Sequence, residues 1–151
     1  MTLEIGAAAP DFTLRTQHGE DVSLSGLRGR PVALVFYPFA FSGICTGELC
    51  EIRDNIGAFS GSDVEVLAIS CDHMFSQRAF ADAEGYTFSL LSDFWPHGEV
   101  SRAYGIFNEE AGAPERGTYL VDAEGVLRWK VEHPIGQARD FEGYRAALAQ
   151  L

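Results

Sequence analysis

The chain is centred on residues 38–45, which read Pro-Phe-Ala-Phe-Ser-Gly-Ile-Cys. An apolar run at residues 32–37 precedes this stretch and predicts a strand that is covered on both faces. After it, apolar residues recur with helical spacing as far as Phe59, which predicts a helix over about residues 43–59. Cys45 is therefore expected in the first turn of a helix that directly follows a strand. Unpaired backbone N–H groups and the positive end of the helix dipole favour the thiolate there.

The rest of the chain alternates between strand and helix patterns. Further strands are expected at residues 12–14, 22–24, 64–70, 88–91, 118–121 and 126–131. Further helices are expected at about 75–85, 100–104 and 141–151, with a loop at 26–30. Strands that alternate with helices predict a parallel sheet with helices on both faces, and the late hairpin adds antiparallel pairing. We therefore predict an α/β protein with a thioredoxin-like fold: one domain over residues 1–151, with a central mixed sheet and an N-terminal β-hairpin.

Composition and charge exclude several classes of protein. The formal net charge is −11, so nucleic acid and anionic membranes should repel the chain. The start of the sequence lacks the basic and apolar regions of a signal peptide, and no apolar run reaches membrane-spanning length. Three cysteines are an odd number, which argues against a secreted disulfide framework. These features predict a cytoplasmic protein with thiol chemistry.

Three residues near Cys45 suit a reactive thiol, although each also has a plain structural interpretation. Pro38 has a fixed φ and can shape the loop over the sulfur, or it can simply end the strand. Ser42 can place a hydroxyl beside the sulfur, or it can cap the helix. Gly43 allows close backbone approach. Cys45 itself can be a small buried hydrophobic residue, as free cysteines often are. The combination is more specific than any one of these residues.

The spacing Pro38-x-x-x-Ser42-x-x-Cys45 resembles the peroxiredoxin motif Pro-x-x-x-Thr/Ser-x-x-Cys. The resemblance extends over nearly the whole chain, in the expected order, through residues 9–14, 36–38, 91–93, 103–105 and 116–122. Residues 41–45, 92–98 and 105–109 are most similar to the alkyl hydroperoxide reductase E subfamily.

The resemblance implies a role for each matched residue. Cys45 would be the peroxidatic cysteine, which peroxide oxidises to a sulfenic acid. Ser42, Arg116 and the backbone N–H of Cys45 would bind the peroxide oxygens, and Arg116 would also hold the thiolate. Glu48 would adjust Arg116, or it would be an exposed acid at the helix start. Trp95 would form a wall of the active-site pocket, or it would be a core aromatic residue.

Cys50 adds a second candidate thiol, five positions after Cys45. Some peroxiredoxins of the bacterioferritin-comigratory (Q) type carry a resolving cysteine at this spacing. In an intact helix the two Cα atoms would be roughly 8.6 Å apart and about 140° apart around the axis. A disulfide needs less than about 7 Å, so the first helical turns would have to unwind. The alternative is that Cys50 only packs, as we expect for Cys71.

Neither a metal nor an organic cofactor is expected. The cysteines lack the short pairs of zinc sites, the four histidines are scattered, and no glycine-rich phosphate loop precedes a helix. The resemblance implies a thiol-dependent peroxidase for hydrogen peroxide, alkyl or fatty-acid hydroperoxides and, as a further candidate, peroxynitrite. Electrons would come from a thioredoxin, a mycoredoxin or a low-molecular-weight thiol, and the family analogy implies a homodimer. The alternatives are a peroxide sensor or relay, a one-cysteine cycle resolved by an external thiol, and a structural module with an unreactive Cys45.

Overall fold

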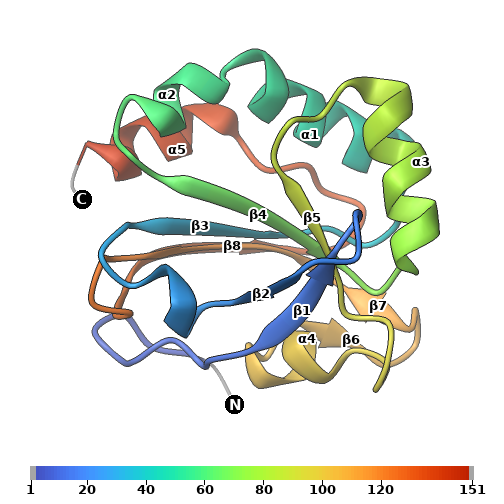
Figure 1. The fold of residues 1–151 in the computed structure, drawn as a ribbon, viewed down its shortest axis with the longest axis horizontal. Coiled ribbons are helices and arrows are strands. Elements are labelled where there is room, and N and C mark those ends of the chain that lie inside the picture. The colour runs from blue at the N-terminus through green and yellow to red at the C-terminus, as the bar shows by residue number, and fades with distance from the viewer. Residues whose placement is uncertain (1–2, 150–151) are drawn as a thin grey trace.

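A computed structural model describes residues 3–149. Its centre is a seven-stranded mixed sheet with the order β2-β1-β5-β4-β3-β8-β9 (Figure 1). The strands are β1 Thr13–Thr16, β2 Asp21–Ser23, β3 Val32–Phe36, β4 Glu65–Ser70, β5 Ser89–Ser92, β8 Arg116–Val121 and β9 Leu127–His133. Within this sheet β4 runs parallel to β3 and β5, and the other pairs are antiparallel. This confirms the predicted mixed sheet, with its N-terminal hairpin β1–β2.

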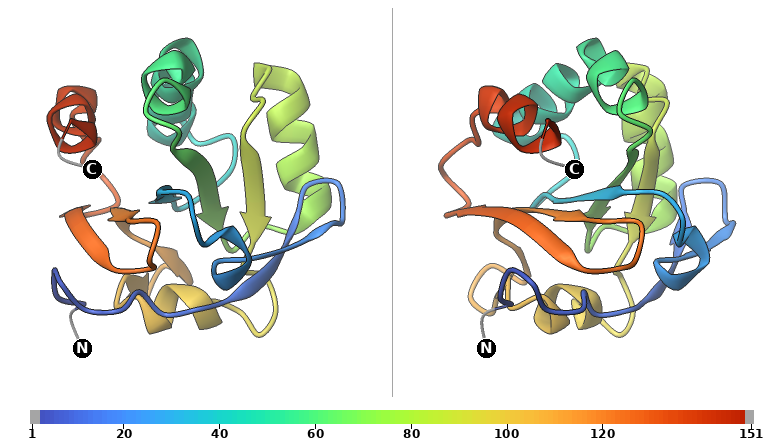
Figure 2. Two further views of the ribbon diagram at one scale, coloured as in Figure 1. Left: turned by 60° about the vertical axis from the view of Figure 1, so that its left-hand side comes forward. Right: turned by 90° about the vertical axis from the view of Figure 1, so that its left-hand side faces the viewer.

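Helices cover the two faces of the sheet unequally (Figure 2). One face carries α1 Gly43–Asp54, α2 Ile56–Ser60, α3 Met74–Glu84 and α5 Phe141–Leu148. The other face carries α4 Glu99–Ala103 and the N-terminal segment. The side chains of β3 are buried throughout and alternate between the two hydrophobic cores. The prediction of a strand covered on both faces is therefore confirmed.

The structure differs from the predicted elements in three places. The predicted helix 43–59 is interrupted at Asn55, whose side-chain Nδ2 donates to the Glu51 carbonyl at 2.8 Å and so competes with the backbone ladder. A short two-stranded sheet, β6 Phe107–Asn108 with β7 Ala113–Pro114, lies in a segment that showed no strand pattern. Residues 25–27 form one turn of 3₁₀ helix where a loop was expected. Leu151, expected on the closing helix, lies outside the described residues.

The sheet topology determines where the site lies. β8 is antiparallel to β3, with Val35 opposite Thr118. Continuing this register by two residues places Arg116, at the start of β8, beside Tyr37, where the chain leaves β3 for the loop before α1. The first residue of one strand therefore meets the end of its neighbour. Among residues 3–149, no helix combines the length and apolar character that crossing a membrane would need.

Candidate active site

Cys45 is the third residue of α1, and its side chain is fully buried, with 0% exposure. The loop that leads to it begins at the buried Pro38 and includes Phe41, a non-glycine residue with a left-handed φ of 69°. Ser42 is the N-cap of α1, and its Oγ accepts a hydrogen bond from the Cys45 N–H at 3.2 Å. The capping interpretation of Ser42 is therefore confirmed. In this structure the Cys45 N–H is already engaged, so a peroxide oxygen would have to share it with Ser42.

Arg116 lies beside the sulfur, although the two residues are far apart in sequence. Its Nη1 is 3.2 Å from Cys45 Sγ, and its side chain is only 2% exposed. The same Nη1 donates to Glu48 Oε1 at 2.6 Å, and Nε donates to the Ile135 carbonyl at 2.6 Å. These contacts hold the Arg116 guanidinium beside the Cys45 thiol. Because arginine keeps its charge, this contact places a fixed positive charge against the sulfur.

Glu48 is not an exposed acid but the centre of a buried ion network. Its Oε1 also accepts from Arg139 Nη2 at 2.8 Å, and its Oε2 accepts from Arg139 Nε at 3.0 Å and from the Arg139 backbone N–H at 2.6 Å. Burial alone would raise the pKa of Glu48, but the hydrogen bonds and charge of Arg139, together with the charge of Arg116, lower it overall. Glu48 is therefore an anion that holds Arg116 in place.

Arg139 is the residue of this network that the sequence did not reveal. It lies in the connection before α5, and its side chain is 1% exposed. Its Nη1 also donates to the Gly117 carbonyl at 2.8 Å and to Thr118 Oγ1 at 3.1 Å, so it is anchored to β8. An arginine in a loop between a strand and a helix has no local pattern that separates it from an exposed one.

The charges of this network have a direct consequence for the thiol. Two guanidinium groups, of Arg116 and Arg139, share one carboxylate, that of Glu48. With a neutral Cys45 thiol, Arg116, Arg139 and Glu48 together carry one excess positive charge. A thiolate at Cys45 would bring the net charge of the four side chains to zero. An unbalanced buried charge is costly, so the second arginine lets Glu48 hold Arg116 without cancelling the charge that faces the sulfur.

We expect Ser42→Ala to lower the free energy of unfolding by about 1 kcal/mol, because the cap on the Cys45 N–H is lost. The reaction with peroxide that the resemblance implies should also slow, since the first turn of α1 holds the sulfur. Urea unfolding and stopped-flow kinetics measure the two effects. Ser42→Thr is the matched control, because it keeps a hydroxyl at the cap. A threonine variant whose unfolding free energy and rate fall as much as those of the alanine variant would contradict this role of the hydroxyl.

Cys50 is on α1 but points away from Cys45. Its Sγ is 3.6 Å from Glu84 Oε2 and 3.5 Å from Tyr86 Oη, and the thiol is half-buried. Cys45, Cys50 and Cys71 are all free thiols. Burial, with the nearby Asp93 charge, raises the pKa of the Cys71 thiol to about 12, which suits the expected packing role.

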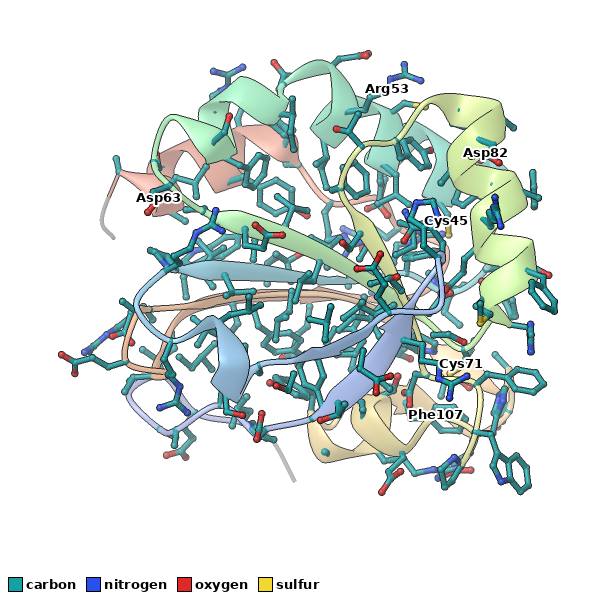
Figure 3. All side chains as sticks on the ribbon, in the orientation of Figure 1. Cys45, Arg53, Asp63, Cys71, Asp82 and Phe107 are labelled. Carbon is teal, nitrogen blue, oxygen red and sulfur yellow. The ribbon has the colours of Figure 1, made fainter. Side chains whose placement is uncertain are left out.

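The structure corrects two expectations about neighbouring residues. A Cβ at Gly43 would meet nothing within 4 Å, so within the described residues no backbone approaches it closely. Trp95 is 83% exposed, so it is not a core aromatic residue. It borders two surface hollows, and none of Cys45, Ser42 and Arg116 lines either of them. That Trp95 forms a wall of the Cys45 site stays a prediction. Figure 3 shows Cys45 between the sheet and the upper helices.

The chain is similar to known proteins over most of its length. A model of the AhpC/TSA family matches residues 5–130. Alkyl hydroperoxide reductase E of Mycobacterium tuberculosis is 49% identical over 150 residues, which is 99% of this chain and 98% of that protein. The crystal structure of Enterococcus faecalis AhpC superposes with a TM-score of 0.91 at 26% identity, covering 99% of this chain and 92% of that one. Peroxidoxin BcpB of M. tuberculosis gives a TM-score of 0.87 at 28% identity, covering 99% and 98%.

Proposed function

Because the chain belongs to the AhpC/TSA family of peroxiredoxins and is a thiol-dependent peroxidase, we propose that Cys45 is its peroxidatic cysteine. One observation carries the proposal: Arg116 Nη1 lies 3.2 Å from the buried Cys45 sulfur. Ser42 and Pro38 belong to the loop that leads to that sulfur. Glu48 holds Arg116, and Arg139 in turn holds Glu48. Ser42, Arg116, Glu48 and Arg139 act through hydrogen bonds or charge, whereas Pro38 acts through its fixed φ.

The proposed reaction is a two-electron transfer from sulfur to peroxide. The Cys45 thiolate attacks the terminal peroxide oxygen, an S–O bond forms and the O–O bond breaks. The leaving oxygen takes a proton and departs as water or an alcohol, and Cys45 becomes a sulfenic acid. The Ser42 hydroxyl and Arg116 donate to the two oxygens while the negative charge moves from sulfur to the leaving oxygen. Hydrogen peroxide and alkyl or fatty-acid hydroperoxides are the proposed substrates, with peroxynitrite as a further one.

We propose that Cys50 resolves the sulfenic acid as an intramolecular disulfide, and that an external thiol system then reduces it. A thioredoxin, a mycoredoxin or a low-molecular-weight thiol would supply the electrons. The separation of the two cysteines on α1 requires local unwinding before the disulfide can form. Turnover with a defined reductant tests the function, because a relay should oxidise a partner protein faster than it completes its own cycle.

Cys50→Ser should still react once with peroxide but should accumulate the sulfenic acid, which excess peroxide carries on to the sulfinic acid. The parent protein should become two hydrogens lighter after one equivalent of peroxide. Intact mass and peptide mapping with trapped thiols distinguish the two products.

Cys71→Ser is the matched control for this experiment, since it removes a buried thiol and should form the disulfide as the parent does. A parent protein with a free Cys50 thiol beside an oxidised Cys45 would rule out the resolving role. The cycle would then use a single cysteine of this chain and an external thiol.

We also propose that residues 1–151 act as one domain, in the cytoplasm and as a homodimer. Family analogy supports the dimer, and so do large exposed apolar side chains. They are Ile5, Phe39, Phe41, Ile44, Phe75, Phe94 and Trp95. The odd number of cysteines, all of them free thiols, supports the cytoplasm.

A further inference from the structure

Three groups on α1 form one polar stripe that faces the segment Glu84–Tyr86. Thr46, Cys50 and Arg53 are four and three residues apart, so they lie on one side of the helix. Glu84 is the last residue of α3, and Tyr86 follows it after a left-handed glycine. In Figure 1 the C-terminal end of α3 lies beside α1, and Figure 3 labels Arg53 on that helix.

Each member of the stripe contacts the 84–86 segment through a named polar group. Tyr86 Oη donates to the Thr46 carbonyl at 3.3 Å and lies 3.5 Å from Cys50 Sγ. The Cys50 thiol points to Glu84 Oε2 at 3.6 Å, and Arg53 Nη1 donates to the Glu84 carbonyl at 2.6 Å. Burial, with the neighbouring Cys50 and Glu84, raises the pKa of Tyr86, so its hydroxyl keeps its proton and can donate.

This face of α1 is turned away from the reactive sulfur. Residues five apart on a helix are about 140° apart around its axis. Cys45 accordingly contacts Arg116 on the sheet side, while Cys50 contacts Glu84 and Tyr86. Bringing the two sulfur atoms together therefore requires two changes: the first turns of α1 must unwind, and Cys50 must leave the 84–86 segment.

We infer that Glu84 and Tyr86 are positioning residues for the resolving step, because they hold Cys50 on the far side of α1 and set the rate at which it is released. The inference rests on the proposed role of Cys50. While the segment holds Cys50, the sulfenic acid at Cys45 remains available to a second peroxide. The contacts made by Glu84 and Tyr86 thus determine how the sulfenic acid partitions between disulfide and sulfinic acid.

The two competing fates of the sulfenic acid are both chemically complete. In resolution the Cys50 sulfur attacks the Cys45 sulfur, an S–S bond forms and the S–O bond breaks. The thiol proton and the departing hydroxyl leave as water. In overoxidation a second peroxide molecule transfers an oxygen to the sulfenic sulfur, which becomes a sulfinic acid, and the peroxide is reduced to water or an alcohol.

Tyr86→Phe removes one hydroxyl and with it the contacts to Cys50 and to the Thr46 carbonyl. We expect disulfide formation to become about two- to tenfold faster, the range for losing one ordinary hydrogen bond. The fraction of sulfinic acid formed at a fixed excess of hydrogen peroxide should fall accordingly.

Glu84→Ala is a second variant, which removes the acceptor of the Cys50 thiol but keeps the backbone contact with Arg53. It should change the partition in the same direction. Rapid quenching with an alkylating reagent, followed by intact mass, measures both products.

Tyr104→Phe is the matched control. Its hydroxyl also donates to a backbone carbonyl, that of Pro10 at 2.7 Å, but it lies in the core on the other face of the sheet. In the Tyr104→Phe variant the sulfenic acid should partition between disulfide and sulfinic acid as it does in the parent.

If the parent forms the disulfide while Tyr86→Phe and Glu84→Ala both keep the parent's partition, the inference is wrong and the role of Cys50 stands. If Tyr104→Phe moves the partition as much as Tyr86→Phe, general destabilisation explains the effect and the inference is also wrong. If the parent forms no disulfide, the resolving role fails and the inference fails with it.

Discussion

Replacing Cys45 with serine should abolish peroxide reduction. A serine hydroxyl in the same buried position remains neutral at physiological pH and is a poor nucleophile for a peroxide oxygen. It leaves Arg116 and Glu48 in place, so the loss would belong to the sulfur and not to the surrounding donors. Consumption of hydrogen peroxide with excess dithiothreitol as reductant measures the effect.

Cys71→Ser is the control for this prediction. Cys71 is also buried, and its thiol has a pKa raised to about 12, so it contributes almost no thiolate at neutral pH. That variant should keep nearly the parent's activity. Full activity in Cys45→Ser would remove Cys45 from the centre of the reaction and would leave Cys50 as the candidate nucleophile.

Arg116→Lys should slow the reaction with peroxide by roughly 10²–10³-fold, the scale for losing one preorganised donor. The substitution keeps a positive charge but loses the planar group that now spans Cys45, Glu48 and the Ile135 carbonyl. A single ammonium cannot reproduce that arrangement, and its attraction to Glu48 would draw it away from the sulfur. Stopped-flow measurement of the first reaction with hydrogen peroxide gives the rate.

Arg128→Lys is a suitable control for Arg116→Lys. Arg128 lies on the edge strand β9, is half-exposed, and pairs with Asp122. Its rate should match that of the parent protein. Unfolding curves of both variants separate a chemical effect from a loss of structure. If a folded Arg116→Lys protein reacts as fast as the parent, the Arg116 guanidinium does not assist the reaction of Cys45 with peroxide.

The sequence predicted those parts of the fold that follow from local periodicity. The buried strand before Pro38, the helix that begins just before Cys45 and the N-terminal hairpin all have clear patterns, and the structure contains them. The contact between Arg116 and Cys45 is different, because 71 positions separate the two residues and no periodicity joins them. Only the family resemblance suggested it. The pairing of β3 with β8 supplies the physical reason.

The missed features depend on tertiary contacts that no local pattern encodes. Arg139 is buried because Glu48 and the Gly117 carbonyl provide its partners, and a loop arginine without them would be exposed. Glu48 is likewise buried only because two arginines surround it. The interruption at Asn55 could have been suspected, since asparagine side chains compete with the backbone for hydrogen bonds. The apolar spacing continued through this position and masked the interruption.

The interruption at Asn55 sets a boundary for the unwinding that we propose. Asn55 is anchored from α5, where Arg145 Nη2 donates to its Oδ1 at 2.9 Å, and α2 begins immediately afterwards. Helix melting is cooperative within one continuous hydrogen-bonded segment, so a break limits how far it spreads. Each catalytic cycle would then melt and rebuild at most about three turns, whereas an uninterrupted helix would allow nearly five. The helices α2 and α5 would stay packed on the sheet, and α1 would reform against them after every reduction.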